Sequence, residues 1–398
     1  MKKPKLLLCL EDFPFPARRN GFSIRYFPII EHFSRKFDID IFAIVPVTPS
    51  EDEIVSAKNF CEKVTIYQRV KCRVGLPRKI ATRIVSLLPF AKPYDCVRYD
   101  QRYIEQAFIQ DHSGVQYDLT VCTSISLSLI VRKFGSTKRL SIDVIDSPYL
   151  LKLRPAVTLL QKYDAFMIKL WERRSVAKAD CAAYISPLDR ELGGGKQCDQ
   201  NKVLVIPNGV YLKDSSSEVV NFHGPTIGYL GHMAYPPNIQ AAKTLHRIFA
   251  KISVVRPDVK LVIVGRDPAP EIVSLGATPN VIVTGTVENI WPYVNGIDLF
   301  VFPMDTGSGQ QNKLLEAMAA AKPVISTQLG NSGVGAVHGE SLIIADTEDV
   351  IAENILKLMD SAAERERIGR NGLMFVRETY SWASVFKQFE NSLFAVGI

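Results

Sequence analysis

Short, continuous apolar runs alternate with helix-like segments along most of the chain. In the second half these runs are TIGYLG, KLVIVG, VIVTG, LFVFP, PVIST and SLIIAD. The first half has the same rhythm in KLLLCL, IDIFAIV, KVTIY, DLTVCTS, RLSIDVID, CAAYIS and VLVIPNG. Each run is too continuous for a half-exposed strand, so the pattern indicates buried parallel strands. Strands that alternate with helices predict an α/β fold with sheets covered on both faces.

A polar, serine-rich stretch divides the chain. We interpret VYLKDSSSEVVNFHGP, residues 210–225, as a linker. It separates predicted domains at 1–209 and 226–379, and a helical segment at 380–398 can pack back on the first domain. Two doubly wound domains would face each other across a cleft at the carboxyl ends of their strands, where such folds bind ligands.

Composition narrows the class of protein. The 398 residues are 47% hydrophobic and 22% charged, enough for two ordinary cores. No apolar stretch approaches the roughly 20 residues that span a bilayer. The first residues resemble a signal peptide, but their apolar run is short and Glu11 follows it directly. We interpret this run as a buried strand. Seven scattered cysteines without a Cys-x-x-Cys pair favour a reducing cytoplasm, and the six histidines show no metal-binding spacing.

The formal net charge of +7 is unevenly distributed. Eight basic residues and one acid lie between Arg69 and Arg98. The middle of this segment, IATRIVSLL, predicts an amphipathic helix that can lie on an anionic membrane. The alternative is a core-facing helix with a charged outer side. No nucleic-acid partner is expected.

The stretch FPMDTGSGQQNKLLEAMAAAKPVIST, residues 302–327, combines a strand end, a glycine loop and a helix. Gly307 and Gly309 let the backbone approach phosphate oxygens, and the first turn of a helix favours an anion. Lys313 and Glu316 are three residues apart and share a face. A lysine would neutralise a diphosphate and a carboxylate would accept from ribose hydroxyls, so the ligand is predicted to be a nucleoside diphosphate. The alternative is a plain turn with a solvated charge pair.

Several motifs carry a family resemblance. The run GSGQQNKLLEAMAAAKPVIS resembles the signature helix of family-4 glycosyltransferases of GT-B fold, in the branch found in bacterial polysaccharide assembly. Other matches follow in order along nearly the whole chain: VIPNGV, GYLGHMAYPPN, LVIVGRDP, VTGTVENIWPYVNGIDLFVFP and ETYSW, with looser matches in PARRNGFSIRYFPIIEHFSRKFDI, IDVIDSP and WERRSVAKADCAAYIS. The resemblance implies a first domain that binds acceptor and a second that binds the nucleotide-sugar.

The resemblance also implies site residues in the second domain. Glu316 fits the second of the family's paired glutamates, whereas Ser308 occupies the first. The family's basic pair for the diphosphate is missing, and His232 stands where an arginine is expected. Lys313, with Arg266, is our candidate replacement, although His232 can equally be a packing residue. The backbone near Val287 would receive the base.

In the first domain, Gly21 lies at the amino end of a predicted helix in PARRNGFSIR, where the family places acceptor and donor phosphate. A plain loop is the alternative. Asp143 and Asp146 end a predicted strand. Asp146 falls near a position where many relatives hold a histidine that touches the donor sugar, and the alternative is a helix-capping aspartate.

The expected function is retaining transfer of a sugar from a nucleotide-diphosphate donor, UDP favoured and GDP possible, to a glycan or lipid-linked acceptor. No nucleophile stands out, so front-face displacement is expected, with Asp146, Lys313 and Glu316 as catalytic candidates. Neither cofactor nor metal is expected. The location would be cytoplasmic, at the inner face of the membrane. Alternatives are a nucleotide-sugar epimerase of the same fold and a catalytically silent binding protein. An oxidoreductase is poorly supported because no GxGxxG opens a helix after an early strand.

Overall fold

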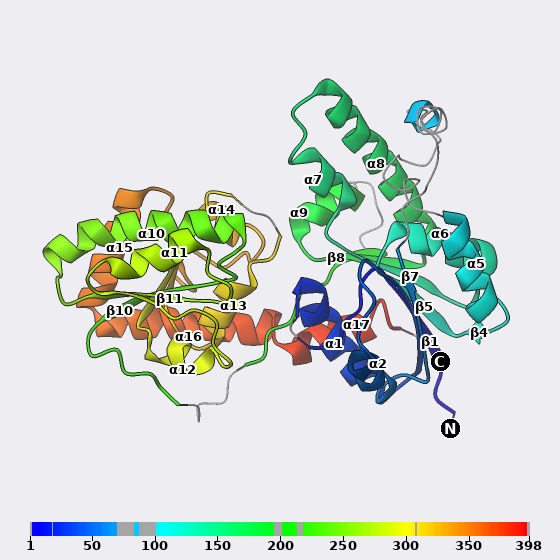
Figure 1. Cartoon of the computed structure of the whole chain (residues 1–398), viewed down its shortest axis with the longest axis horizontal. Helices are drawn as coiled ribbons and strands as arrows, with labels where there is room; N and C mark the ends of the chain where they lie inside the picture. The colour runs from blue at the N-terminus through cyan, green and yellow to red at the C-terminus, as the bar shows by residue number, and fades with distance from the viewer. Residues whose placement is uncertain are drawn as a thin grey trace. The chain divides into compact units, whose positions relative to one another are not determined.

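The protein is described by a computed structural model, which covers residues 2–17, 19–69, 83–86, 101–194, 201–212, 218–306 and 309–395. It divides into two compact units, Met1–Asn208 with Phe386–Ile398, and Gly209–Val385. In each unit helices cover both faces of a parallel sheet (Figure 1). The predicted α/β class with two doubly wound sheets is confirmed. Most of the basic segment 69–98, and the site candidates Gly307 and Ser308, lie outside the described residues.

The first unit contains a seven-stranded sheet in the order β3-β2-β1-β5-β7-β8-β9. A separate short pair, β4 with β6, has no counterpart in the sequence pattern. The strands are β1 (Lys5–Leu10), β2 (Asp38–Val45), β3 (Lys63–Gln68), β4 (Gln116–Tyr117), β5 (Leu119–Cys122), β6 (Ser136–Thr137), β7 (Leu140–Ile145), β8 (Cys181–Tyr184) and β9 (Val203–Val205). The helices are α1 (Gly21–Phe33), α2 (Glu51–Lys58), α5 (Gln101–His112), α6 (Ile125–Phe134), α7 (Pro148–Leu153), α8 (Leu159–Lys178), α9 (Pro187–Asp189) and the π-helix η1 (Arg190–Gly194).

The second unit contains a six-stranded parallel sheet in the order β12-β11-β10-β13-β14-β15. Its strands are β10 (Thr226–Leu230), β11 (Lys260–Val264), β12 (Val281–Val283), β13 (Leu299–Phe302), β14 (Val324–Ser326) and β15 (Ile343–Ile344). Its helices are α10 (Pro236–Val255), α11 (Pro270–Val273), the 3-10 helix η2 (Ser274–Ala277), α12 (Trp291–Gly296), α13 (Asn312–Ala319), α14 (Gln328–Asn331), α15 (Glu348–Asp360), α16 (Ala362–Thr379) and α17 (Trp382–Glu390), which continues into the first unit.

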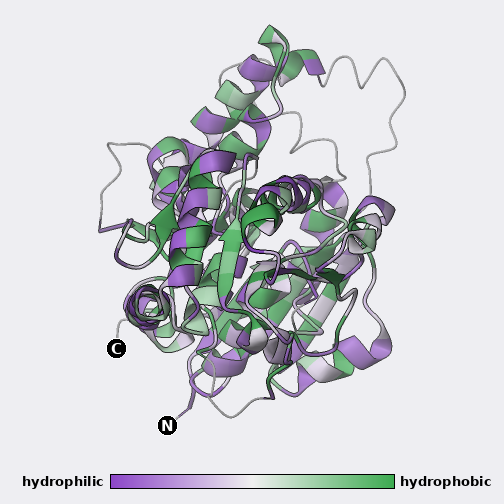
Figure 2. Ribbon diagram, turned by 90° about the vertical axis from the view of Figure 1, so that its left-hand side faces the viewer, coloured by the Kyte–Doolittle hydropathy of each residue, from purple (hydrophilic) through white to green (hydrophobic). Residues whose placement is uncertain are grey.

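The apolar runs form the sheet centres, as their continuity predicts. All residues of β13 are buried, and β10 and β8 are buried along their whole length. Figure 2 shows mostly hydrophobic strands between helices that have one polar and one apolar side. Capping side chains start several helices, such as Asn20 of α1, whose Oδ1 accepts from the Ser23 amide. No helix in the described ranges is both long and apolar enough to cross a bilayer.

A buried ion pair lies where the chain leaves the first unit. Arg25 of α1 donates two hydrogen bonds of 2.8 Å to the Asp143 carboxylate on β7, and both side chains are fully buried. The same guanidinium donates to the Pro207 carbonyl at 3.0 Å and to Asn208 Oδ1 at 3.1 Å. Tyr26 also donates to Asp143, at 2.8 Å. Asp143 therefore fixes the connection instead of facing a ligand.

Inside the second unit the first and last motifs of the resemblance meet. Gly209 lies against Trp382, where a Cβ would come within 2.3 Å of the indole ring. Val210 donates to the Tyr380 carbonyl at 2.7 Å and forms a bridge with Ser381. Gly209 is therefore required by close packing, which explains the glycine of VIPNGV.

Candidate functional site

The order of strands in the second sheet reverses between β10 and β13. Strands β11 and β12 lie on one side of β10, whereas β13, β14 and β15 lie on the other. Open parallel sheets bind ligands outside the carboxyl ends of the two strands at such a reversal. A ligand site is therefore expected at the loops that follow β10 and β13. Both loops contain residues that were predicted from the sequence.

The Lys313 side chain lies at this reversal. Its Nζ is 2.6 Å from Asn238 Oδ1, 3.0 Å from Tyr229 Oη and 3.1 Å from Met304 Sδ. Tyr229 comes from β10, Asn238 from the first turn of α10, and Met304 from the loop after β13. Lys313 is only 9% exposed, so its three N–H groups meet three protein acceptors instead of water.

Burial makes this ammonium electrostatically unusual. Desolvation lowers the pKa of Lys313 from 10.5 to about 7. Within the described part of the chain, no carboxylate forms an ion pair with Lys313. Its Nζ lies 5.1 Å from the centroid of the Tyr229 ring. A buried cation without a counter-charge is stabilised by an anion that binds above it. A strongly shifted pKa at a strand end marks a candidate functional group.

Helix α13 begins at Asn312 beside the same loop. No side chain caps its start at Gln311, and the buried Asn312 Oδ1 accepts no hydrogen bond. Gly309 has a φ of +71°, and its carbonyl lies 2.2 Å from the position that a Cβ of Gly333 would take. Gly309 is thus closely packed against Gly333, and the helix that follows has an open start, which suits an anionic ligand.

Glu316 lies one turn after Lys313 on α13 and is partly buried. The helical pattern placed both charges on one ligand-facing side. The structure instead buries Lys313 beside β10 and leaves Glu316 closer to solvent.

The loops after β10, β11 and β12 bring together three further predicted residues. His232 Nε2 is 3.2 Å from Asp267 Oδ2, and Arg266 Nε is 3.9 Å from the same oxygen. Asp267 has a φ of +52°, and its amide donates to Thr286 Oγ1 at 3.1 Å. Val287 follows in the same loop and packs partly buried against the core. His232 and Arg266 therefore form one basic edge, held by an aspartate that sequence reasoning missed.

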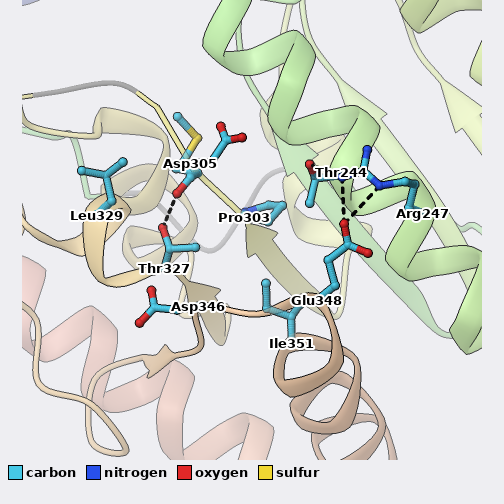
Figure 3. A pocket seen from close by; sticks show the side chains of 10 residues that line it. Thr244, Arg247, Pro303, Asp305, Thr327, Leu329, Asp346, Glu348 and Ile351 are labelled. Carbon is cyan, nitrogen blue, oxygen red and sulfur yellow. Dashed lines mark hydrogen bonds and ion pairs between the residues drawn. The ribbon is translucent and has the colours of Figure 1, made fainter.

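Figure 3 shows a pocket of 370 Å³ in the same unit. Met304, which lines this pocket, is also a partner of Lys313. Arg247 points into the pocket but donates to Glu348 Oε1 at 2.7 Å, and Thr327 donates to the Met304 carbonyl at 2.7 Å. Its charged lining is three carboxylates and one guanidinium, namely Asp305, Asp346, Glu348 and Arg247. This surplus of carboxylates suits hydroxyl donors and opposes a phosphate.

In the first unit, Asp146 follows an unusual backbone conformation. Ile145 has a φ of +61° at an irregularity in the pairing of β7 with β8. This conformation is costly for a β-branched residue and occurs where the surroundings impose it. Burial, then the nearby Asp189, raises the pKa of the partly buried Asp146 carboxyl. Ser147, not Asp146, caps α7, so the helix-capping alternative for Asp146 is wrong.

A buried carboxylate supports this strand end. Glu172 of α8 accepts from Ser147 Oγ and the Tyr149 amide, each at 3.0 Å, and from Tyr184 Oη at 2.9 Å. Desolvation raises the pKa of Glu172 to about 7, although these hydrogen bonds act to lower it. Glu172 therefore holds the segment that follows Asp146. Gly21 is the first residue of α1 and is exposed, with open space where a Cβ would lie.

No group of three or more histidine, cysteine or acidic side chains within the described ranges is arranged to hold a metal ion.

Similarity to known proteins bears on the activity. Residues 224–361, which contain β10 to β15, match the family described as Glycosyl transferases group 1. The comparisons support a glycosyltransferase of GT-B fold.

The curated proteins that this chain resembles are distant in sequence. The chain is 22% identical over 407 residues to an uncharacterized 44.6 kDa protein in the cps region of Klebsiella pneumoniae, covering 96% of this chain and 99% of that protein. It is 26% identical over 254 residues to the capsular polysaccharide biosynthesis glycosyltransferase CapM of Staphylococcus aureus, covering 58% of this chain and 65% of that one.

Solved structures establish the GT-B fold. Alr3699/HepE of Anabaena, crystallised in complex with UDP, superposes with a TM-score of 0.67 at 14% identity, covering 97% of this chain and 98% of that one. TarM of Staphylococcus aureus gives a TM-score of 0.67 at 13% identity, covering 98% and 99%.

The residues that support the site were not predicted from the sequence. Tyr229, Asn238 and Met304 around Lys313, and Glu172 behind Asp146, carry no motif of their own. A usable signal was the run GYLGHMAYPPN, which has a tyrosine in a buried strand and an asparagine at a helix start. A buried tyrosine needs a hydrogen-bond partner.

Proposed function

We propose that this glycosyltransferase moves a sugar from a nucleotide-diphosphate donor to a glycan or lipid-linked acceptor, with retention, in cell-surface polysaccharide biosynthesis. The capsule-associated relatives support the pathway class, and the UDP complex of the similar HepE structure supports a uridine donor. GDP remains the second candidate nucleotide. The reaction would take place at the cytoplasmic face of the membrane.

The observation that carries the proposal is the buried Lys313 ammonium at the strand-order reversal. A diphosphate above the start of α13 would supply the counter-charge that this cation lacks. Because the three N–H groups of Lys313 are satisfied within the protein, the ammonium would act mainly through its charge. It would stabilise the leaving diphosphate, whose negative charge grows as the glycosidic bond breaks.

The other residues receive roles around this centre. His232 and Arg266 would reach the outer phosphate oxygens from the loops after β10 and β11. The backbone near Val287 would receive the base, and Glu316 would accept from the ribose hydroxyls. The loop at Gly307, Ser308 and Gly309 would lie along the diphosphate.

In the first unit, Asp146 would face the donor sugar and Gly21 would lie beside the acceptor and donor phosphate. The strained Ile145 backbone supports a positioning requirement at Asp146. The leaving diphosphate would help to deprotonate the acceptor hydroxyl in a front-face displacement.

Calorimetric titration with UDP, GDP and their sugars tests the donor. We expect UDP to bind, and Glu316→Ala to weaken UDP binding by about tenfold, because a hydrogen bond to a charged group contributes about 1.5–3 kcal/mol. Unchanged thermal unfolding is the control for the fold. Equal affinity in this variant would contradict the ribose assignment. Failure of every nucleotide to bind would contradict the proposed function.

Product analysis tests the reaction. Proton NMR of the product should show the anomeric configuration of the donor, and activity should persist in excess chelator because N–H groups and cations hold the diphosphate. A donor converted to its epimer without an acceptor would identify an epimerase instead. Strict dependence on manganese would contradict metal-independent transfer.

A further inference from the structure

Apolar side chains face solvent where helices α7 and α8 are joined. Val157 in the connection is 84% exposed, and Leu159, the first residue of α8, is 87% exposed. Further exposed apolar side chains in the same segment are Leu151, Leu160, Tyr163 and Phe166. We call these six residues the α7–α8 tip. Figure 1 shows that the beginning of α8 projects away from the first sheet, whereas its end lies near β8.

The pattern along α8 separates this surface from the core. Leu159, Tyr163 and Phe166 have the spacing i, i+4 and i+7, so they form one stripe. Ala165 and Ile168 belong to the opposite, buried face. The buried face begins only at Ala165, so packing within the unit does not explain the apolar stripe at the beginning of the helix. Contiguous exposed apolar surface of this kind marks an interaction site.

A second segment adds to the same surface. Arg83 donates to Asp164 of α8 at 2.6 Å, which attaches residues 83–86 to the helix. The next two residues, Ile84 and Val85, are 61% and 55% exposed. This ion pair also neutralises Asp164, which is the only acidic residue between 148 and 170.

The charges around the tip identify its partner. Lys152, Arg154 and Lys162 flank the apolar residues, and Arg154 and Lys162 are exposed. A second copy of the chain would bring these like charges together across the contact, which disfavours a dimer. Apolar side chains within a basic rim match the interface of an anionic bilayer, where the former enter the acyl boundary and the latter meet the headgroups.

We propose that the α7–α8 tip is a membrane-insertion surface that holds the first unit on anionic lipid. This inference supplies the membrane partner of the proposed function, because a lipid-linked acceptor is presented at such a surface. It differs from the expectation based on residues 69–98 because it rests mainly on the apolar tip of α8, to which residues 83–86 of that segment are attached.

Vesicle sedimentation of the full chain tests this proposal. The wild-type protein should bind vesicles of phosphatidylglycerol and phosphatidylcholine at low salt, and bind phosphatidylcholine alone much less. Leu159→Ser with Phe166→Ser should weaken binding about tenfold or more, since two large apolar side chains lose their lipid contact. The matched control is Val254→Ser with Val255→Ser, two exposed valines at the end of α10, and should bind like wild type.

Charge and insertion are tested separately. Replacing Lys152, Arg154 and Lys162 by glutamine should reduce binding to anionic vesicles by about fivefold for each residue near the surface. Leu159→Trp should give a blue-shifted emission component when anionic vesicles are added, because the ring enters an apolar environment. No shift, or equal binding by the serine variant, would overturn the insertion surface.

Two further outcomes separate the alternatives. If sedimentation equilibrium shows a wild-type dimer that becomes monomeric in Leu159→Ser with Phe166→Ser, a second copy covers the tip and the membrane proposal is wrong. UDP affinity should be the same in every tip variant, so failure of vesicle binding and failure of donor binding are distinguishable.

Discussion

At the scale of single residues, Lys313 and Glu172 stand out because each is an ionisable group enclosed by neutral partners. Lys313 contacts a phenol, an amide and a thioether, whereas Glu172 accepts from two hydroxyls and a backbone amide. Burial disfavours the charged form of both, so both pKa values move to about 7. Small changes in pH near neutrality therefore change the charge at two points in the molecule.

Lys313→Met, a neutral change of similar length, tests the cation at the site. Between pH 7 and 10.5 the unfolded chain binds more protons than the folded one at this lysine, so this group makes folding more favourable as pH rises. The variant lacks this dependence and should gain stability over wild type at pH 6 by a few kcal/mol, less at pH 9. Urea unfolding at the two pH values measures the difference.

The same variant should lose UDP affinity by about tenfold to a hundredfold and hardly change for the monophosphate. The ratio of wild-type to variant affinity should fall as pH rises through 7, where Lys313 loses its proton. Equal losses for monophosphate and diphosphate would show that Lys313 is structural.

Glu172→Gln tests the second buried group. The folded protein holds more protons than the unfolded chain between pH 4.5 and 7 at Glu172, so its contribution to stability is lost as pH rises through that range. Relative to wild type, the variant should gain roughly 3 kcal/mol between pH 4.5 and 8, measured by chemical unfolding. Glu353→Gln, an exposed change on α15, is the control and should show no such trend. If the unfolding free energies of wild type and Glu172→Gln change with pH in the same way, the raised pKa of Glu172 is contradicted.

At the scale of elements, the sequence predicts the strands well and the surroundings of the site poorly. Continuous apolar runs can only be buried strands in this alternation, and KLLLCL is β1 from Lys5 to Leu10. The burial of Lys313 was not predictable, because its partners Tyr229, Asn238 and Met304 are 84, 75 and 9 residues away. A helical period shows which side chains share a face, but not which strand lies behind that face.

The bulged end of β7 shows the same limit, since no residue in IDVIDSP signals a left-handed isoleucine. Ile145→Gly should relieve this backbone and leave stability within about 1 kcal/mol, as lost side-chain packing offsets the relief. Turnover should fall about tenfold to a hundredfold because the Asp146 carboxylate is held less firmly. Ala321→Gly, at a φ of +55°, is the matched control for activity assays and thermal unfolding. Full activity of Ile145→Gly would show that the strained backbone at Ile145 does not position the Asp146 carboxylate for turnover.

At the scale of the whole molecule, each unit fixes its own end of the connection between them. Arg25 holds Pro207 and Asn208 in the first unit, and Trp382 holds Gly209 in the second. The sequence predicts a linker at residues 210–225, and in the structure its first residue, Val210, donates to the Tyr380 carbonyl. Contacts between segments so far apart in the sequence, such as Gly209 with Trp382, cannot be predicted from either motif alone.

Removing one member of the Arg25–Asp143 pair should be costly. Arg25→Met leaves a buried carboxylate with Tyr26 as its remaining donor, and should lower the stability of the first unit by about 3–5 kcal/mol. Arg25→Met with Asp143→Asn should lose less than the single variant, because no charge stays buried alone. Calorimetric melting of both variants measures this, and a double variant less stable than the single one would contradict it.

Leu393 and Phe394 belong to the core of the first unit, although they follow the second unit in sequence. Phe394 stacks on Phe33 with centroids 4.1 Å apart, and the Leu393 carbonyl accepts from Ser141 Oγ at 2.9 Å. During synthesis the sheet and most helices of the first unit therefore leave the ribosome before the segment that completes their core. The second unit, complete by Val385, can fold earlier than the unit that precedes it in sequence. Until residues 386–395 have been synthesised, the first unit lacks apolar side chains of its own core, and such incomplete units are prone to aggregate.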